Sequence, residues 1–259
     1  KEHLIINMHG KNKTICIAGK NDCAIKALSY VIKKYRKYKI LALPNKTDNG
    51  VDNWQKSFKK FAKRKKVEIV SLNSLYRRKD LYLFSLEYEN ILPVKKFISK
   101  NLYNLHFSLL PKYRGCHTNY LQIAKGEKKS GVTLHEIDNG IDTGRIIDKI
   151  DFNIPLNSTG YDNYKTLLKK SVLLFKKNFS KIINGNYSSK KQNLKAGSYF
   201  NRKSINYKKI AHLKLIRHNK ITHNKIRALI FDPYQLPIYN GKKIKKSIFK
   251  DKKIKLFYL

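Results

Sequence analysis

The first half of the chain alternates continuous apolar runs with segments in which apolar residues recur every three or four positions. Residues 14–19 form such a run, which is typical of a buried strand, and helical spacing follows over residues 24–35. Further strands are predicted at 39–43, 67–70, 80–86 and 102–107, and a further helix at 54–65. This alternation predicts an open, mostly parallel sheet, whose ligands bind at the carboxyl ends of its strands.

The pattern changes in the second half. Residues 132–137 and 145–153 are predicted to be a pair of strands, and 161–183 a long helix. The composition then turns polar over 184–199, which suggests a boundary. We therefore expect an α/β fold with a Rossmann-like catalytic domain over 1–185 and a small C-terminal subdomain over 186–259. Asn240-Gly241 stands between apolar flanks and predicts a β-hairpin in that subdomain.

Composition supports a globular protein with an unusual charge. The chain has 259 residues, of which 41% are hydrophobic, and its formal net charge is +40. A polyanionic partner such as nucleic acid is one explanation for this charge. However, the lysines are spread along the whole chain, which favours solvated side chains. Under either interpretation, anionic small ligands are attracted.

The three cysteines show neither a pairing pattern nor metal-ligand spacing. We therefore expect a reduced, cytoplasmic protein without a metal. No apolar run is long enough to span a membrane, and the apolar patch at residues 4–6 is too short for a signal peptide.

Candidate chemistry lies at the end of the strand predicted at 102–107. Asn104 and His106 are two residues apart, so in a strand their side chains point to the same face. An amide that can donate to an oxyanion, next to an imidazole that can carry a proton, is suited to acyl transfer. Asp142 follows in a turn between Gly140 and Gly144 and supplies a carboxylate.

Two segments carry a family resemblance. Asn104-Leu-His-Phe-Ser-Leu-Leu-Pro-Lys-Tyr-Arg-Gly115, together with Gly131-Val-Thr-Leu-His135 and the following Asp142-Thr-Gly144, resembles the signature of the 10-formyltetrahydrofolate-dependent formyltransferases. The resemblance implies that Asn104, His106 and Asp142 are catalytic and that 10-formyltetrahydrofolate is the formyl donor. His135 belongs to the same string, and we interpret it as structural or as acting through its neighbours.

The resemblance also implies a folate site. The loop after the strand at 80–86 is similar to the family's loop whose backbone binds the pterin ring, although a plain connecting loop is the alternative. The residues implied in folate binding are Leu86, Glu87, Tyr88, Ile91, Leu92, Pro93, Asp138, Gly140 and Ile141.

A second ligand site is expected where the first strand gives way to a helix. Gly19-Lys20-Asn21-Asp22 would place helix N–H groups and a cation near a phosphate, although an ordinary turn is the alternative. This segment and the loop over 44–55 are similar to nucleotide-sugar formyltransferases. The expected substrate contacts are Lys20, Asn21, Asn45, Lys46, Tyr113, Arg114, His117, Phe231 and Tyr234. Phe231, Tyr234 and Tyr239 either stack on the base, contact a second subunit or simply pack.

The sequence thus predicts a sugar N-formyltransferase that acts on a dTDP-linked amino-dideoxy sugar. The resemblance is to enzymes for dTDP-4-amino-4,6-dideoxyglucose, which implies synthesis of surface polysaccharide such as lipopolysaccharide O-antigen, and a homodimer. Methionyl-tRNA formyltransferase is the alternative that the charge favours. Against it, Cys116-His117-Thr118 replaces the small residues and proline of those enzymes, and the tail is short. A non-enzymatic nucleic-acid binder would need clustered basic residues, so no nucleic-acid partner is expected.

Overall fold

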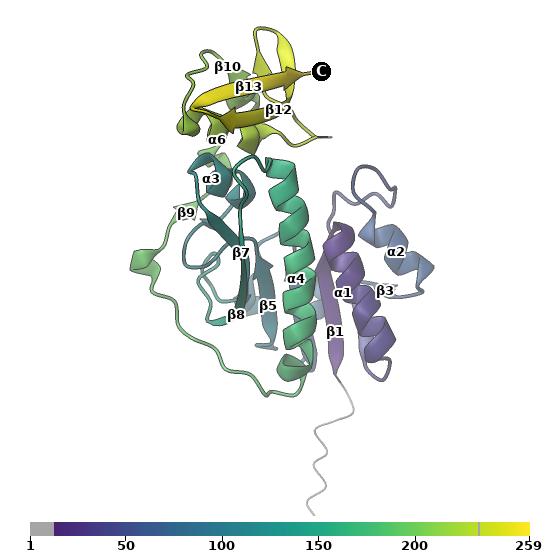
Figure 1. Ribbon diagram of the computed structural model, residues 1–259. Coiled ribbons are helices and arrows are strands. Elements are labelled where there is room, and N and C mark those ends of the chain that lie inside the picture. Colours follow the sequence, from purple (N-terminus) through teal and green to yellow (C-terminus); the bar gives the residue numbers. More distant parts are fainter. Residues whose placement is uncertain (1–12, 233) are drawn as a thin grey trace, which may run out of the picture.

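A seven-stranded sheet forms the centre of the molecule. The computed structural model describes residues 13–232 and 234–259, so the apolar patch at 4–6 lies outside the described residues. The strand order is β3-β2-β1-β4-β5-β7-β8, as Figure 1 shows in part. These strands are β1 (Thr14–Gly19), β2 (Lys39–Pro44), β3 (Glu68–Ile69), β4 (Leu81–Leu86), β5 (Leu102–His106), β7 (Lys129–Glu136) and β8 (Ile146–Asn153).

The first five strands are parallel, whereas β7 and β8 are antiparallel to their neighbours. Alternate residues of each strand serve different layers of the core. Ile15, Ile17 and Phe84 pack on one face, and Cys16 and Leu83 on the other. This is the mostly parallel α/β sheet that the alternating pattern predicts, and the fold class is confirmed.

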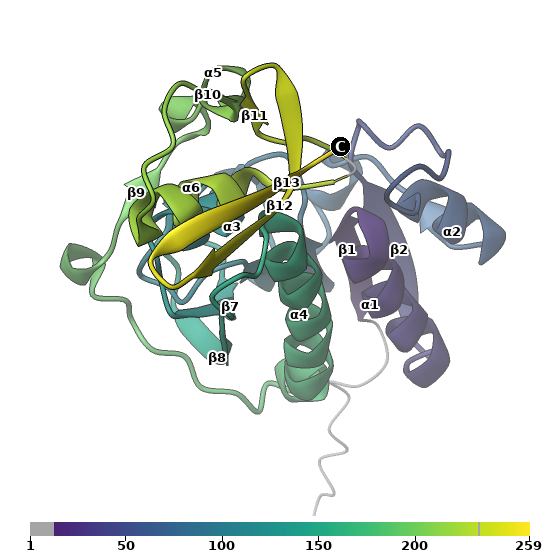
Figure 2. The same cartoon turned by 45° about the horizontal axis from the view of Figure 1, so that its top comes forward.

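Two long helices cover one face of the sheet. They are α1 (Asn21–Lys34) and α4 (Gly160–Ile183), which lie side by side in Figures 1 and 2. Helix α4 begins with a capping box, in which Thr159 and Asp162 bond to each other's backbone N–H groups. Phe175 and Phe179 of α4 meet Phe84 of the sheet, with ring centroids 5.2 and 5.3 Å apart.

The helix predicted at 54–65 is shorter in the structure. Helix α2 (Phe58–Arg64) begins only after Ser57, whose hydroxyl accepts from the Lys60 N–H at 2.9 Å. Asp48 receives the N–H of Lys59 at 2.8 Å. These acceptors stop the helix from extending backwards, because an N-cap residue is not helical. Trp54 therefore lies in a loop.

The C-terminal residues form a second unit above the edge where the parallel strands end (Figure 1). Its sheet has the order β10-β11-β12-β13 and is packed on helix α6 (Lys220–Leu229). The strands are β10 (His212–Leu213), β11 (Ile238–Tyr239), β12 (Lys242–Lys250) and β13 (Lys253–Tyr258). Asn240 and Gly241 have φ of 48° and 74° and join β11 to β12, so the predicted hairpin is confirmed.

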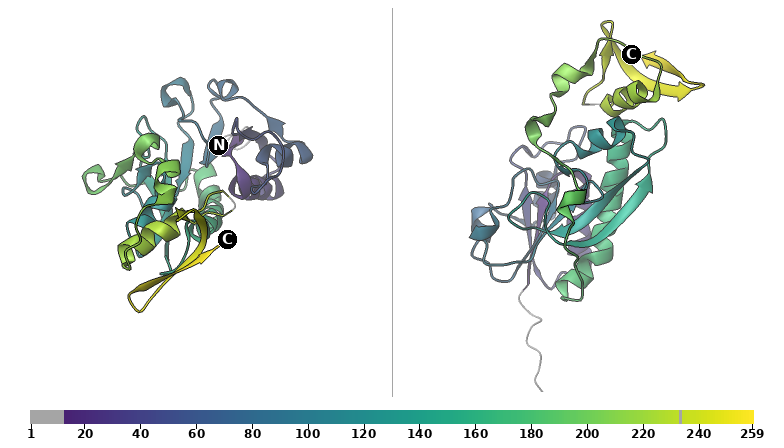
Figure 3. Two further views of the ribbon diagram at one scale, coloured as in Figure 1. Left: turned by 90° about the horizontal axis from the view of Figure 1, so that it is seen from above. Right: turned by 90° about the vertical axis from the view of Figure 1, so that its left-hand side faces the viewer.

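The segment between the two units returns along the α/β domain. It starts at the C-terminal end of α4 and runs past the sheet toward the C-terminal unit, as Figures 1 and 3 show. Lys190 bridges Ile146 of β8, and β9 (Tyr199–Phe200) pairs with β6 (Arg114–Gly115). Helix α3 (Thr118–Ala124) follows β6, and α5 (Tyr207–Ala211) precedes β10. The boundary at 185/186 stays a prediction.

Candidate active site

Asn104 and His106, at the end of β5, face the carboxylate of Asp142. Asn104 Nδ2 is 3.2 Å from Asp142 Oδ1, and His106 Nδ1 is 3.4 Å from Asp142 Oδ2. The two side chains share a face because they are two positions apart in a strand. The structure therefore brings together the three residues that the sequence selects, although their catalytic role stays a prediction.

His135 completes this cluster. Strand β7 pairs with β5 in a register that puts His135 opposite Asn104. Its Nδ1 donates to the Glu136 carbonyl at 2.7 Å, and its Nε2 lies 3.2 Å from Asn104 Nδ2 and 3.4 Å from Asp142 Oδ1. His135 thus contacts two of the three predicted residues directly, and the antiparallel register accounts for its position.

The backbone around Asp142 is tightly constrained. Asp142 has φ of 54°, in the left-handed region, and its Oδ2 accepts the Gly115 N–H at 2.8 Å. Gln192, from the returning segment, donates to the carbonyls of Asp142 and Gly144 at 3.0 and 2.6 Å. A Cβ on Gly144 would lie only 1.8 Å from the Glu136 carbonyl oxygen, so glycine is required there. No sequence pattern marks Gln192 as part of the site.

The charge of Asp142 is fixed by these neighbours. Its side chain is only 12% exposed. Burial alone would raise the pKa of Asp142, but His106, His135 and the Gly115 N–H together outweigh it and hold the pKa well below its usual range. The cluster therefore contains a permanent carboxylate at neutral pH.

His106 has an acceptor at each ring nitrogen. Its Nε2 lies 2.7 Å from the Tyr113 carbonyl oxygen, which can only accept, so Nε2 carries hydrogen in this arrangement. Its Nδ1 faces Asp142. A proton that arrives at Nδ1 is therefore met by a carboxylate, which suits the ring to take up and release a proton.

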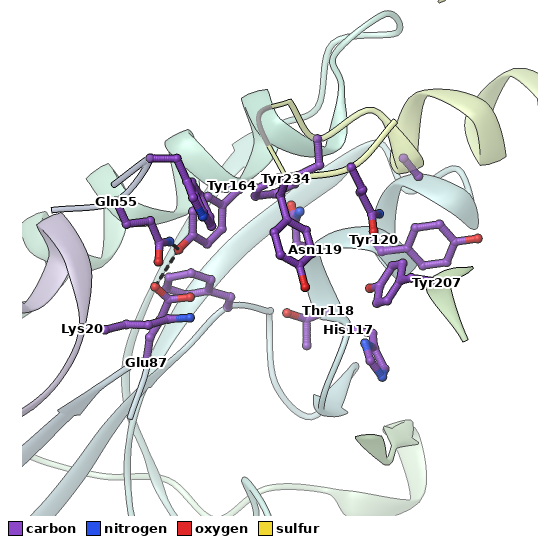
Figure 4. Close-up of a pocket in the computed structure, with 15 residues that line it drawn as sticks. Lys20, Gln55, Glu87, His117, Thr118, Asn119, Tyr120, Tyr164, Tyr207 and Tyr234 are labelled. Atoms are coloured by element: carbon purple, nitrogen blue, oxygen red, sulfur yellow. Dashed lines mark hydrogen bonds between the residues drawn. The ribbon is translucent and has the colours of Figure 1, made fainter. Parts of the chain in front are cut away.

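A pocket of about 390 Å³ opens next to this cluster, between the two units. Figure 4 shows its lining residues, with Lys20, Gln55 and Glu87 at one end and His117 and Tyr207 at the other. The pocket is lined by Lys20, Trp54, Gln55, Glu87, Phe107, His117, Thr118, Asn119, Tyr120, Tyr164, Tyr207, Ala228, Phe231, Tyr234 and Gln235. The cluster adjoins the pocket through Phe107, the residue after His106.

Four predicted substrate residues line this pocket, namely Lys20, His117, Phe231 and Tyr234. The side chain of Glu87, predicted for the folate, also lies there. The sequence did not single out Trp54, Gln55, Tyr164 or Tyr207 as ligand contacts. Trp54 is the only tryptophan in the sequence, and this rarity could have indicated it as a candidate ligand contact. Its centroid lies 5.7 Å from that of Phe231 and 6.1 Å from that of Tyr234.

Other predicted residues are engaged within the protein. Asn45 is 3% exposed, and its amide bonds Glu87 O and Glu89 N at 3.1 and 3.2 Å. Tyr113 is buried and donates its hydroxyl to Glu127 at 2.7 Å. Arg114 lies in β6, and the backbone N–H of Lys46 bonds the carboxylate of Glu89.

The residues predicted for the folate follow two strands that flank β5. Leu92 is buried and Tyr88 and Pro93 are partly buried, whereas Ile91 is 75% exposed. Asp138 shapes its own turn, because its Oδ1 accepts the Gly140 N–H at 3.1 Å and the Thr143 hydroxyl at 2.6 Å. Leu86 ends β4, and Ile141 precedes Asp142. The loop after β4 begins next to Ser85, the register partner of Asn104, and the turn over 138–141 leads into Asp142, which Asn104 contacts.

Among residues 13–232 and 234–259, no group of three or more His, Cys, Asp or Glu side chains is arranged to hold a metal ion. In the same part of the chain, no helix is both long and apolar enough to cross a membrane.

Residues 55–176 match the family described as formyl transferase. The bifunctional polymyxin resistance protein ArnA of Wigglesworthia glossinidia brevipalpis is 35% identical over 114 residues, which are 43% of this chain and 17% of that protein. Methionyl-tRNA formyltransferase of Clostridioides difficile is 36% identical over 96 residues, 37% of this chain and 31% of that protein. The matched stretches therefore span less than a third of these curated relatives.

Solved structures match over most of both chains. WlaRD, described as a sugar 3N-formyl transferase with dTDP and 5-N-formyl-THF, is 45% identical with a TM-score of 0.87, over 92% of this chain and 87% of that one. The N-formyltransferase from Helicobacter canadensis, in complex with folinic acid and dTDP-3-aminofucose, is 44% identical with a TM-score of 0.86, over 91% and 87%. Methionyl-tRNA formyltransferase from Clostridium thermocellum shares the fold at 18% identity, with a TM-score of 0.64 over 95% of this chain and 98% of that one.

In the Asp142→Asn variant, the free energy of unfolding is expected to depend less on pH in acid than in the wild type. Because the pKa of Asp142 is lower in the folded protein than in the unfolded chain, its carboxylate stabilises the fold above about pH 4, the ordinary value for Asp. That contribution is lost as the pH falls toward the folded-state pKa. In urea titrations between about pH 6 and 3, the free energy of unfolding should fall more steeply in the wild type than in the variant.

Asp151→Asn is the control, because this exposed carboxylate pairs with Lys129 in solvent, where such pairs contribute little. It should follow the wild type. Parallel curves for Asp142→Asn and wild type would show that Asp142 is not stabilised as a buried anion.

Proposed function

Because this chain belongs to the formyl transferase family, we propose that it is a sugar N-formyltransferase. It moves the formyl group of 10-formyltetrahydrofolate to the amine of a dTDP-linked amino-dideoxy sugar. The observation that carries the proposal is the meeting of Asn104, His106 and Asp142 beside a pocket that contains Lys20 and several aromatic side chains. The similarity to two sugar N-formyltransferases at 44–45% identity supports it.

The proposal also specifies which carbon of the sugar ring carries the amine. The sequence favours a 4-amino sugar by resemblance, whereas the similar structures are described with a 3N activity and with dTDP-3-aminofucose. A 4-N formyltransferase from Francisella tularensis is only 20% identical. We therefore propose an amine at C3. A panel of dTDP-3-amino and dTDP-4-amino sugars, with methionyl-tRNA as a further acceptor and products identified by mass, tests both the amine and the alternative activity.

The protein groups can perform the transfer as follows. Asn104 Nδ2 exchanges one of its contacts with Asp142 and His135 for the formyl oxygen, and donates to it as the amine nitrogen adds to the formyl carbon and the oxygen gains charge. His106 accepts the proton that the amine loses and returns it to the folate nitrogen when the old carbon–nitrogen bond breaks. Asp142 orients His106 and stabilises its charged form.

The residues present fit the formyl donor. The loop over 86–93 begins beside Asn104, because Ser85 is the register partner of Asn104, and the turn over 138–141 leads into Asp142, which Asn104 contacts. Leu86, Glu87, Tyr88, Ile91, Leu92 and Pro93 would bind the pterin mainly through backbone groups, together with Asp138, Gly140 and Ile141. Hydrogen-bonding backbone beside apolar side chains suits a flat ring with an amide-like edge.

The pocket fits a nucleotide-linked sugar. Lys20 is the only Lys or Arg among the described residues that line it, so we assign it to the diphosphate. Trp54 and Tyr234 lie at the rim, 40% and 70% exposed. Exposed aromatic faces of this kind bind a base by stacking, so we assign them to the thymine.

We also propose that the enzyme works in the cytoplasm, supplies surface polysaccharide synthesis such as that of O-antigen, and has no nucleic-acid partner. The resemblance supports the pathway. Cys16 and Cys23 are free and buried, and burial raises the pKa of both thiols. Free cysteines agree with a reducing compartment.

Asn104→Ala, His106→Ala and Asp142→Ala should each reduce kcat by about 100-fold or more, because each removes a group that acts in the transfer. Formyl transfer is measured with saturating donor and sugar nucleotide, and circular dichroism checks the fold. His212→Ala, an exposed histidine of β10, should be unchanged. Turnover close to wild type in His106→Ala would refute the assigned mechanism.

Lys20→Ala should raise KM for the sugar nucleotide and leave KM for the folate unchanged, because a cation that meets the diphosphate does not contact the formyl donor.

Trp54→Ala and Tyr234→Ala should each weaken dTDP binding by about 5- to 150-fold, the value of one aromatic–base stack. Isothermal titration measures the affinity. Tyr258→Ala is the matched control, since Tyr258 is 40% exposed on β13. Equal losses in all three aromatic variants would count against the rim as the base site.

A homodimer is expected in solution. Strand β13 is one of the two edge strands of its sheet, and Phe257 and Tyr258 on it are 37% and 40% exposed. Apolar edge strands are commonly covered by pairing. Light scattering should give twice the 30.4 kDa of one chain at micromolar concentration. A mass of one chain would refute the dimer, whatever the enzymatic activity.

A further inference from the structure

Glu87 is the one carboxylate among the described residues that line the pocket. Tyr164 donates its hydroxyl to Glu87 Oε2 at 2.9 Å, and the amide Nδ2 of Asn21 donates to the same oxygen. Neither contact uses the other carboxylate oxygen, Oε1. Figure 4 shows Glu87 beside Gln55 and Tyr164 at the end of the pocket where Lys20 lies.

The donors that hold Glu87 are themselves fixed. Asn21 Oδ1 accepts the Cys23 N–H at 2.9 Å, so its Nδ2 must point toward Glu87 and the Tyr164 hydroxyl. Gln55 Nε2 donates to that hydroxyl at 2.7 Å. Since the Tyr164 oxygen accepts from Gln55 and Asn21, its own proton is directed to Glu87. Burial and the nearby Glu87 raise the pKa of Tyr164, so it remains a donor.

The backbone at Glu87 is in a conformation that side chains disfavour. Glu87 has φ of 60°, and its partner Asn21 has φ of 53°. A residue other than glycine in this region is destabilised, because its Cβ crowds the backbone. The chain thus holds a glutamate where glycine or asparagine would be less strained, and strain of this kind is concentrated at functional positions.

A held carboxylate in a pocket for an anionic ligand needs a hydrogen-bond donor from that ligand. The diphosphate offers acceptors only, and Lys20 is present for it. A sugar ring offers hydroxyl and amine donors. We propose that Glu87 is a specificity-determining residue that accepts a hydrogen bond from a hydroxyl or amine of the sugar ring, an inference that rests on the proposed function. Its side chain therefore serves the sugar, while the folate is assigned to backbone groups of the loop.

The test compares three ligands that share one nucleotide. Isothermal titration measures the Kd of dTDP, of a dTDP-hexose with hydroxyls but no amine, and of the dTDP-amino sugar, for wild type and Glu87→Gln. The variant should bind dTDP like the wild type and the amino sugar about 10-fold or more weakly, because hydrogen bonds to charged groups are strong. Loss with the hexose as well assigns the contact to a hydroxyl, and loss with the amino sugar alone assigns it to the amine.

Glu89→Gln is the matched control from the same loop. Its carboxylate holds Lys46 N and the Thr47 hydroxyl and does not line the pocket. All three affinities should be unchanged in it. Unchanged affinity for the amino sugar in Glu87→Gln would overturn the proposal, and so would an equal loss for dTDP, because the residue would then serve the nucleotide or the fold.

The outcome also separates this inference from the proposed function. If wild type binds neither dTDP nor the dTDP-amino sugar, the function itself fails and the inference fails with it. If wild type binds and formylates the amino sugar while Glu87→Gln matches it in Kd and KM, only the inference fails. Retained dTDP affinity shows that the variant is folded.

Discussion

The buried carboxylate of Asp142 is the constraint on which the site depends. An anion removed from water must be matched by donors or cations, since its desolvation otherwise prevents ionisation. Here His106, His135 and the Gly115 N–H supply that match. Each comes from a different part of the fold, so β5, β7 and β6 must all be in register for Asp142 to remain charged. The same contacts fix the imidazole that would carry the proton.

Backbone strain is concentrated around the site. Nine described residues other than glycine have positive φ, and five of them lie in or beside the active-site cluster and the pocket: Asn21, Glu87, Tyr113, His117 and Asp142. Tyr113 gives its carbonyl to His106, and His117 gives its ring to the pocket. Such conformations persist only where the surrounding structure enforces them. The site is therefore held rigidly before any ligand arrives, which is what electrostatic catalysis requires.

The sequence predicts what depends on local pattern. Strand and helix alternation is local, so the mostly parallel sheet and the same-face pair Asn104 and His106 could be anticipated. The pocket depends on contacts across the chain. Trp54 meets Phe231 and Tyr234, and Gln192 reaches Asp142, with separations that no local pattern encodes. Trp54 fitted a helical period, but capping at Ser57 ended that helix. The turn of the β12–β13 hairpin contains Asp251 and Lys252 in place of Asn-Gly, so it gave no signal.

The net charge of the chain can attract anionic ligands, but only the groups in the pocket can select among them. The chain carries a formal charge of +40, which draws any anion toward its surface at low ionic strength. Among the described residues, however, the pocket lining holds one lysine and one glutamate, and more than half of its other members are Phe, Trp or Tyr. A field of this size cannot distinguish one nucleotide sugar from another. Discrimination must therefore come from the short-range groups, in which opposite charges on one wall favour a ligand with acceptors and donors placed side by side.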